Sequence, residues 1–302
     1  MVKHPVLFET FARVDTARQV WEQIKKAQPK ILYFYSNKAR IEKPDEVKRN
    51  NEIRSWIKEI DWSCDLHTFF RDEYVDVYTS VSGSKNWVFS NENTAIILED
   101  DCLPSAGFFE FCDHFLDYYK DVKKISFITG NNYINNTNSK ESDHYITRSL
   151  HHYGWATWKD RWDSINFDID VDSIINGNYI AEYFNDDFFL RKYNQLLYKS
   201  VSPFVKRTKC WDFIKVLNQF KDKTYAVSPV YNLVQNIGVC GEHTSNASGY
   251  IYETGNNDDK MHYPFTGKRE LICPNLKYDR EASKVEGIRS YKDLFLMFLH
   301  DI

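Results

Sequence analysis

The sequence predicts an α/β protein with a mostly parallel, twisted central sheet and helices on both faces. Short apolar runs, rich in β-branched and aromatic residues, alternate with longer segments whose apolar residues recur at helical spacing. This alternation continues over the first 130 residues and is typical of β-α-β units. At 302 residues the chain is long enough to bury a large core, and we expect a single domain.

The elements of the first part follow from these runs. Asp15 is suited to cap the first helix and Pro29 to close it, whereas Pro44 and Pro104 fit early positions of later helices. The predicted strands cover residues 5–11, 31–35, 64–70, 94–98 and 124–129. The predicted helices cover residues 15–27, 44–60, 81–89 and 104–120.

The alternation weakens after residue 130. Residues 131–143 and 239–249 are polar and predict loops, and residues 290–302 form an amphipathic segment. Short strands are expected at residues 145–150 and 225–231, and helices at residues 184–200 and 211–221. In the first of these helices we expect an inward face formed by Phe188, Leu190, Tyr193 and Leu197.

Composition narrows the function classes. The net charge of −4 and the pI near 6.2 argue against attraction to nucleic acid phosphates. Six cysteines occur without a C-x-x-C pair, and Met1 to Pro5 lacks the features of a signal peptide. No apolar run approaches 18 residues. We therefore expect reduced thiols and a cytoplasmic protein whose sequons at Asn135 and Asn246 carry no glycan.

The strongest chemical signal is an acidic triplet, Glu99-Asp100-Asp101, that follows the apolar run 95–98. Ligands of open α/β sheets bind outside the carboxyl ends of the strands. Three adjacent carboxylates repel one another unless a cation lies among them. The alternative is a solvated acidic turn.

Other catalytic signatures are missing from the sequence. There is no G-x-G-x-x-G, no G-x-x-x-x-G-K-[ST], no H-E-x-x-H and no G-x-S-x-G. A dinucleotide-dependent dehydrogenase, a P-loop NTPase, a zinc protease and a serine hydrolase are therefore disfavoured. An oxygen-ligated divalent cation that bridges a diphosphate remains as the interpretation of the triplet.

Five segments in order resemble one enzyme family. They are residues 96–104 with the acidic triplet, 129–132 (Thr-Gly-Asn-Asn), 154–158 (Gly-Trp-Ala-Thr-Trp), Trp211-Asp212, and 236–239 (Asn-Ile-Gly-Val) with His243-Thr244. Together they resemble GT-A nucleotide-diphospho-sugar glycosyltransferases, most of all bacterial relatives of N-acetylglucosaminyltransferase I. The resemblance implies a GT-A (Rossmann-like) fold with a donor half (1–103), an acceptor half (104–270) and a C-terminal extension (271–302).

The resemblance also implies a chemistry. It predicts Mn²⁺- or Mg²⁺-dependent, inverting transfer from a nucleotide sugar, most simply a UDP-sugar, to a glycan or lipid-linked glycan acceptor in surface polysaccharide synthesis. Asp101 would ligate the metal and His243 would be a second ligand or a diphosphate contact. Glu99 and Asp100 would hold the donor sugar and the ribose, or waters on the metal. Asp212 would be the catalytic base, with Asp187 in reserve.

Further residues extend the predicted site. Arg13, Ser36, Asn37 and Lys85 are candidate nucleotide-sugar contacts, although Arg13 is equally suited to a solvated helix entry. Trp155, Trp158 and Trp211 are candidate acceptor contacts. The spacing of Trp155 and Trp158, three residues apart, is compatible with one helical face, where they would either pack in the core or form a stacking platform for an acceptor sugar.

Two rival functions share these features. A sugar nucleotidyltransferase also uses a parallel sheet and acidic metal ligands, but it usually carries a Gly-rich basic loop after the first strand, where this chain has Phe11 to Asp15. A non-catalytic sugar- or partner-binding module on the same fold is the second rival. The amphipathic segment 290–302 is expected to dock on the protein, with peripheral membrane contact as the alternative.

Overall fold

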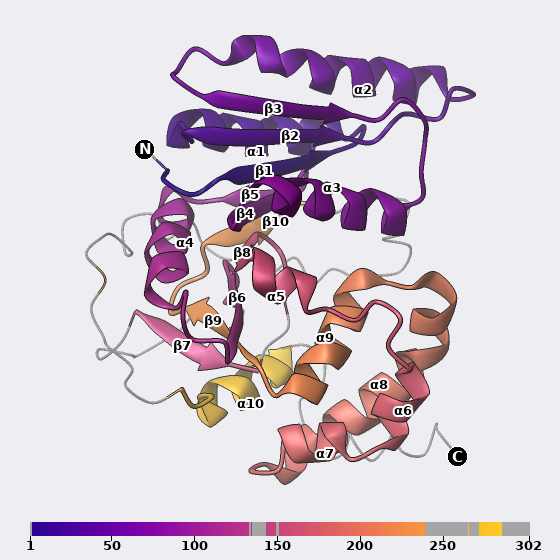
Figure 1. Ribbon diagram of the computed structural model, residues 1–302, viewed down its shortest axis with the longest axis vertical. Coiled ribbons are helices and arrows are strands. Elements are labelled where there is room, and N and C mark those ends of the chain that lie inside the picture. The colour runs from indigo at the N-terminus through magenta and orange to yellow at the C-terminus, as the bar shows by residue number, and fades with distance from the viewer. Residues whose placement is uncertain are drawn as a thin grey trace.

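A computed structural model describes residues 2–132, 134, 143–148, 151–238, 265 and 272–285 (Figure 1). His243, both sequons and the segments 239–249 and 290–302 lie outside the described residues, so the expectations for them stay predictions. No helix in the described part is both long and apolar enough to cross a membrane.

The predicted α/β class with a mostly parallel sheet is confirmed. The central sheet has the strand order β3-β2-β1-β4-β8-β6-β9-β7, and only β7 and β8 run against the other six described strands (Figure 1). Its strands are β1 Val6–Thr10, β2 Ile31–Ser36, β3 Asp65–Phe70, β4 Thr94–Glu99, β6 Ile125–Thr129, β7 His144–Thr147, β8 Trp155–Trp158 and β9 Tyr225–Pro229. A small second sheet pairs β5 Cys102–Pro104 with β10 Val234–Asn236.

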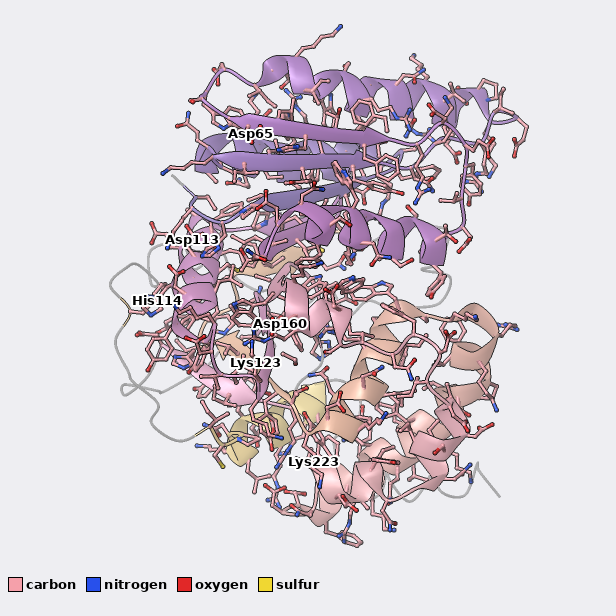
Figure 2. All side chains as sticks on the ribbon, viewed as in Figure 1. Asp65, Asp113, His114, Lys123, Asp160 and Lys223 are labelled. Carbon is pink, nitrogen blue, oxygen red and sulfur yellow. The ribbon has the colours of Figure 1, made fainter. Side chains whose placement is uncertain are left out.

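Helices cover both faces of the central sheet. Side chains from α1 Val14–Ala27, α2 Pro44–Ser55 with its 3₁₀ extension Trp56–Glu59, and α4 Ala106–Tyr118 share one apolar core. Side chains from α3 Val77–Asn91, α5 Lys159–Asp163 and α9 Trp211–Asp222 form a second core on the other face. At the surface, Lys123 before β6 pairs with Asp160 of α5 (Figure 2).

A third apolar core lies entirely among helices of the second half. It joins α9 to α6 Val171–Asn176, α7 Tyr179–Tyr183 and α8 Phe188–Thr208. The last described helix, α10 Leu276–Val285, packs against β7 and α8. Side chains of α8, α9 and α10 line the cavity described below.

Several local expectations are wrong. Pro104 ends strand β5 instead of opening a helix, because β10 pairs with this segment, and α4 starts after Ser105. The N-cap of α1 is Arg13, not Asp15, which lies in the first turn. Phe188 is 59% exposed at the start of α8 and does not join the inward face.

Residues 155–158 form strand β8, not a helix. The strand is inserted between β4 and β6, antiparallel to both. Trp155 and Trp158 therefore project to opposite faces of the sheet and belong to different apolar cores. The local spacing suggested a helix, but pairing with two neighbouring strands decided the conformation.

Candidate active site

The acidic triplet lies at the carboxyl end of the central strand β4. Glu99 is the last residue of β4 and pairs in register with Glu9 of the parallel strand β1. Asp100 and Asp101 form the turn that leads into β5 and are buried. The sheet thus gathers four carboxyl groups, of Glu9, Glu99, Asp100 and Asp101, at the edge where ligands of α/β sheets bind.

Arg13 supplies the first counter-charge. Its guanidinium donates to Asp101 Oδ2 at 2.7 Å and to Asp100 Oδ1, and the Phe11 amide donates to Asp100 Oδ2 at 3.3 Å. Burial still raises the pKa of Asp100 to about 6, helped by Asp101 and opposed by Arg13. Arg13 is therefore already bound to two acids of the triplet. The predicted contact with a nucleotide would have to replace these hydrogen bonds.

Lys85 supplies the second counter-charge from α3. Its side chain is fully buried, and its Nζ lies 2.8 Å from Glu9 Oε2, while Ser84 also donates to Glu9. Burial raises the pKa of Glu99 to about 8, with Lys85 opposing and Glu9 reinforcing the shift. Lys85 is enclosed by protein here, so a phosphate contact would require it to leave Glu9.

A late segment closes over the triplet. Because β10 pairs with β5, the chain at residues 236–238 returns beside Asp101, whose carbonyl accepts from the Ile237 amide at 2.8 Å. A Cβ atom at Gly238 would overlap Asp101 Oδ2, so any larger residue would displace this carboxylate. Residues 236–238, which belong to the segment that resembles the family's closing loop, therefore lie next to the acidic triplet.

Tyr153 is a site residue that the sequence did not reveal. Extending the β4–β8 pairing from Ile97↔Trp155 places it beside Glu99, and its amide donates to Asn131 Oδ1 at 3.0 Å on the other side. The residue is 40% exposed. Burial, reinforced by neighbouring groups that include Glu99 and Asp212, raises the pKa of its hydroxyl to about 12. Tyr153 therefore presents a neutral phenol between the triplet and Asp212.

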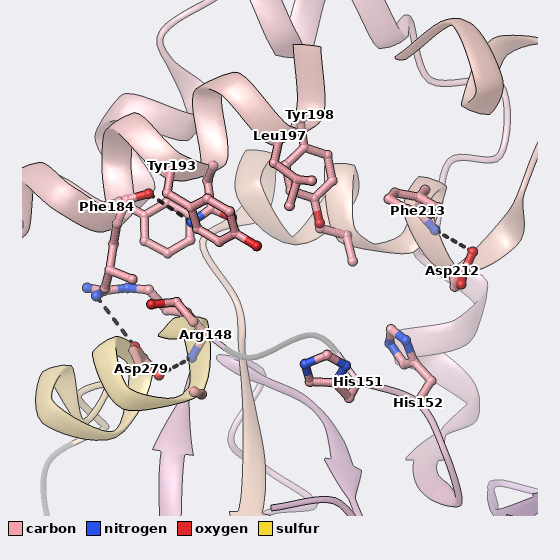
Figure 3. A pocket seen from close by; sticks show the side chains of 15 residues that line it. Arg148, His151, His152, Phe184, Tyr193, Leu197, Tyr198, Asp212, Phe213 and Asp279 are labelled. Carbon is pink, nitrogen blue, oxygen red and sulfur yellow. Dashed lines mark hydrogen bonds and ion pairs between the residues drawn. The ribbon is translucent and has the colours of Figure 1, made fainter. Parts of the chain in front are cut away.

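Asp212 lies in the first turn of α9 and is half-buried. Its Oδ1 accepts from Cys210 Sγ at 2.8 Å and from the Phe213 amide at 2.8 Å. Burial, with Asp212 next to it, raises the pKa of the Cys210 thiol to about 12, so the thiol stays a donor at neutral pH. Asp212 also borders a cavity of about 210 Å³, opposite His151 and His152 (Figure 3).

Trp211 links the two parts of the site. Its ring stacks on Trp155 with centroids 5.6 Å apart, and Lys85 Nζ lies 4.7 Å from its centroid. Trp158 does not join them: it pairs with Thr94 at the far end of β4, and its indole donates to the Leu116 carbonyl. Trp155 and Trp211 are themselves buried. Their rings therefore pack around the site and expose little surface on which an acceptor sugar could stack.

A buried lysine supports His152. Lys215, one turn after Trp211 on α9, has its Nζ 2.9 Å from His152 Nε2 and 3.3 Å from the Phe127 ring centroid. Burial lowers the pKa of both Lys215 and His152 well below their ordinary values. The contact fixes the imidazole beside the cavity, and no sequence motif marked Lys215.

Three further predicted residues have structural contacts. Ser36 Oγ accepts from Asn50 and Arg54, and Asn37 Nδ2 donates to the Val75 carbonyl at 2.8 Å, so both hold the loops after β2. Asp187 caps α8 and pairs with Arg280, with its side chain buried. The reserve base is therefore already committed to holding α8 and α10 together.

Comparison with known proteins assigns no family. The chain matches no protein-family model, and no curated protein matches it. HddC from Yersinia pseudotuberculosis complexed with GMP-PN aligns with 8% identity and a TM-score of 0.29, covering 52% of this chain and 78% of that one.

Two further structures are UDP-glucose pyrophosphorylases, both with 8% identity. The apo enzyme has a TM-score of 0.35 over 79% of this chain and 94% of that one. The enzyme complexed with UDP-glucose has a TM-score of 0.27 over 54% and 71%. Likeness at this level carries no functional argument, so the function must be argued from this chain's own residues.

Proposed function

We propose that this protein is a metal-dependent GT-A glycosyltransferase that moves a sugar from a nucleotide diphosphate donor, most simply a UDP-sugar, to a glycan acceptor. The observation that carries the proposal is the acidic triplet at the carboxyl end of β4, with Asp212 and a cavity beside it. A divalent cation and a proton acceptor are the two groups that such a transfer requires.

The charges around the triplet suit a divalent cation. Four carboxyl groups face two cationic side chains, Arg13 and Lys85. The described residues contain no group of three or more His, Cys, Asp or Glu side chains arranged to hold a metal. Magnesium-type sites commonly use one or two carboxylates, and substrate phosphates and water complete the shell. Asp101 would hold the ion, which would stabilise the negative charge that develops on the leaving diphosphate.

The remaining roles follow from position. Arg13, once released from the two aspartates, is within reach of a diphosphate bound at the same edge. Asp212 would accept the proton of the attacking acceptor hydroxyl, since it lies at the cavity. Tyr153 would donate a hydrogen bond between the two substrates.

A sugar nucleotidyltransferase is less well supported. Only residues 11–13 connect β1 to α1, and none of them is glycine. This connection leaves no room for the Gly-rich loop that would wrap a nucleoside triphosphate.

The test is a panel of nucleotide sugars with Mn²⁺, monitored by thermal shift and by release of the nucleoside diphosphate. We expect UDP with Mn²⁺ to stabilise the wild-type protein, and Asp101→Asn to lose both stabilisation and turnover. Asp121→Asn, at an exposed turn, is the matched control and should behave as wild type. The proposal fails if no nucleoside diphosphate stabilises the protein. Release of pyrophosphate from a nucleoside triphosphate and a sugar phosphate would instead identify a nucleotidyltransferase.

A further inference from the structure

The cavity next to Asp212 has polar ends and an aromatic wall. It lies between α8, α9, α10 and the segment that carries Arg148, His151 and His152 (Figure 3). Asp212 and the two histidines form one end, and Arg148 and Asp279 form the other. The remaining side chains around it are Phe184, Leu190, Tyr193, Asn194, Leu197, Tyr198, Phe213, Val216, Ala282 and Ser283.

The volume of the cavity limits what it can hold. At about 210 Å³ it exceeds a cavity of about 150 Å³, which accepts benzene. It is smaller than the roughly 300–1,000 Å³ of pockets for drug-sized ligands. One six-membered ring with its substituents therefore fits inside the cavity, whereas a disaccharide or a nucleotide would extend beyond it.

The lining selects the chemistry of that ring. A purely apolar ligand would displace water from the polar side chains at both ends of the cavity and supply no hydrogen bond in its place, at about 1–3 kcal/mol for each group that it buries. An anionic ligand finds no unmatched positive charge among the described side chains that line the cavity, because Arg148 already pairs with Asp186 at 2.8 Å and faces Asp279 at 3.7 Å. A neutral ring with several hydroxyl groups satisfies both ends, and its C–H face suits the tyrosine and phenylalanine rings.

At the Arg148 end of the cavity, some side-chain atoms of Arg148 and Asp279 make no hydrogen bond to the described part of the chain. Arg148 is only 6% exposed, and within the described part of the chain its Nε and Nη1 have no hydrogen-bond partner. The same holds for Asp279 Oδ2, while Oδ1 of that carboxylate accepts from Thr147 and from the Arg148 amide. These three atoms are themselves fully buried, so a ligand would contact Arg148 and Asp279 through the other side-chain atoms that line the cavity, and its hydroxyls would replace water there.

We propose that this cavity is the acceptor subsite and that it takes a single neutral pyranose ring, with the hydroxyl to be glycosylated directed at Asp212 and the opposite hydroxyls at Arg148 and Asp279. This inference rests on the proposed function, because it assigns the substrate class of the same site. It also replaces the predicted acceptor contacts Trp155, Trp158 and Trp211 with the rings of Tyr193, Tyr198 and Phe213.

The experiment fills the cavity without touching a charge. Leu197 lines the cavity, whereas its neighbour Leu196 has similar partial exposure and does not (Figure 3). Leu197→Trp is therefore compared with Leu196→Trp, and Val216→Phe fills the cavity from α9 should the first variant not fold. The probes are methyl glycosides of glucose, galactose, mannose and N-acetylglucosamine, followed by saturation-transfer NMR. A parallel thermal shift with UDP and Mn²⁺ reports the donor side.

We expect at least one methyl glycoside to bind wild type and Leu196→Trp. Its signal should fall about tenfold or more in Leu197→Trp and Val216→Phe, with the UDP–Mn²⁺ shift unchanged in all four proteins. Equal glycoside binding in filled and control variants, or no binding by wild type, would overturn the acceptor subsite. Loss of glycoside binding in the filled variants, without any UDP–Mn²⁺ shift, would retain the sugar site and reject the proposed transferase.

Discussion

At the scale of single residues, the site is organised by counter-charges. Arg13 and Lys85 each hold carboxyl groups that would otherwise repel one another at the end of β4. Both were expected to contact the nucleotide sugar, and both are bound to acids. We infer that the Arg13 and Lys85 side chains stabilise the fold of the acidic edge. A bound substrate would then compete with the carboxylates for at least one of these two side chains.

Substitution of Asp212 should slow the catalytic step without affecting the fold or donor binding. Asp212→Asn keeps the shape and can still accept from the Phe213 amide, so the fold should persist. We expect kcat for sugar transfer to fall by about 10²–10⁴, with the UDP–Mn²⁺ thermal shift unchanged. Asp222→Asn, at the exposed other end of α9, is the control. Unchanged kcat would remove Asp212 from the mechanism.

Tyr153 should contribute one hydrogen bond. Tyr153→Phe deletes only the hydroxyl of a side chain that is 40% exposed, so stability should hardly change. We expect kcat/KM to fall about 3- to 10-fold, which corresponds to roughly 0.5–1.5 kcal/mol. Tyr118→Phe, similarly exposed on α4, should leave kcat/KM as in wild type. A loss of stability without loss of activity would assign Tyr153 a packing role.

At the scale of elements, two pairings build the site. The β5–β10 pairing brings residues 234–236 to the strand that follows the acids. Helix α10 closes the cavity, and its buried Asp279 accepts from Thr147 at 2.5 Å at the end of β7. Both contacts join segments more than 120 residues apart, so local sequence patterns do not report them.

Asp279 should make stability depend on pH. Burial raises its pKa to about 7 from an ordinary 3.8, so between these values the folded protein holds a proton that the unfolded chain releases. This contribution to stability is complete below about pH 4 and is lost as the pH rises through about 7. The Tm of Asp279→Asn minus that of wild type should therefore increase from pH 4 to pH 8, by about 2 °C or more.

Glu281→Gln, on the same helix and more exposed, is the control for this pH series. Its Tm difference from wild type should show no matching rise, because its carboxyl group lies at the surface. A flat pH profile for Asp279→Asn would show that Asp279 ionises as easily in the folded protein as in the unfolded chain.

At the scale of the molecule, one sheet crosses the boundary between the donor and acceptor halves. Strand β4, before residue 103, pairs with β8, after it, and β6 and β9 continue the same sheet (Figure 1). A fragment that ends at residue 103 would leave β4 as an open, apolar edge. In the proposed function the two halves differ in the substrate that each would bind, and they are not units that fold separately.

The whole chain should therefore unfold in one step. We expect a single calorimetric transition for the full-length protein, with the calorimetric enthalpy equal to the van't Hoff enthalpy. Residues 1–103 alone should aggregate or stay unfolded by circular dichroism. Two resolved transitions, or a folded fragment, would contradict a shared sheet as the unit of stability.

The sequence alone determined the class of fold, most element positions in the first 130 residues and the acidic end of β4. Those features depend on hydrophobic period and on turn residues, which are local. The Trp155–Trp158 strand, Tyr153 and the Lys215–His152 contact were decided only by the tertiary structure. Each depends on partners distant in the chain, as when Lys215 of α9 meets His152 beside Phe127. A periodic pattern in the sequence indicates which secondary structure a segment can form. The elements that pack against the segment decide which of its charged and hydroxyl groups come into contact.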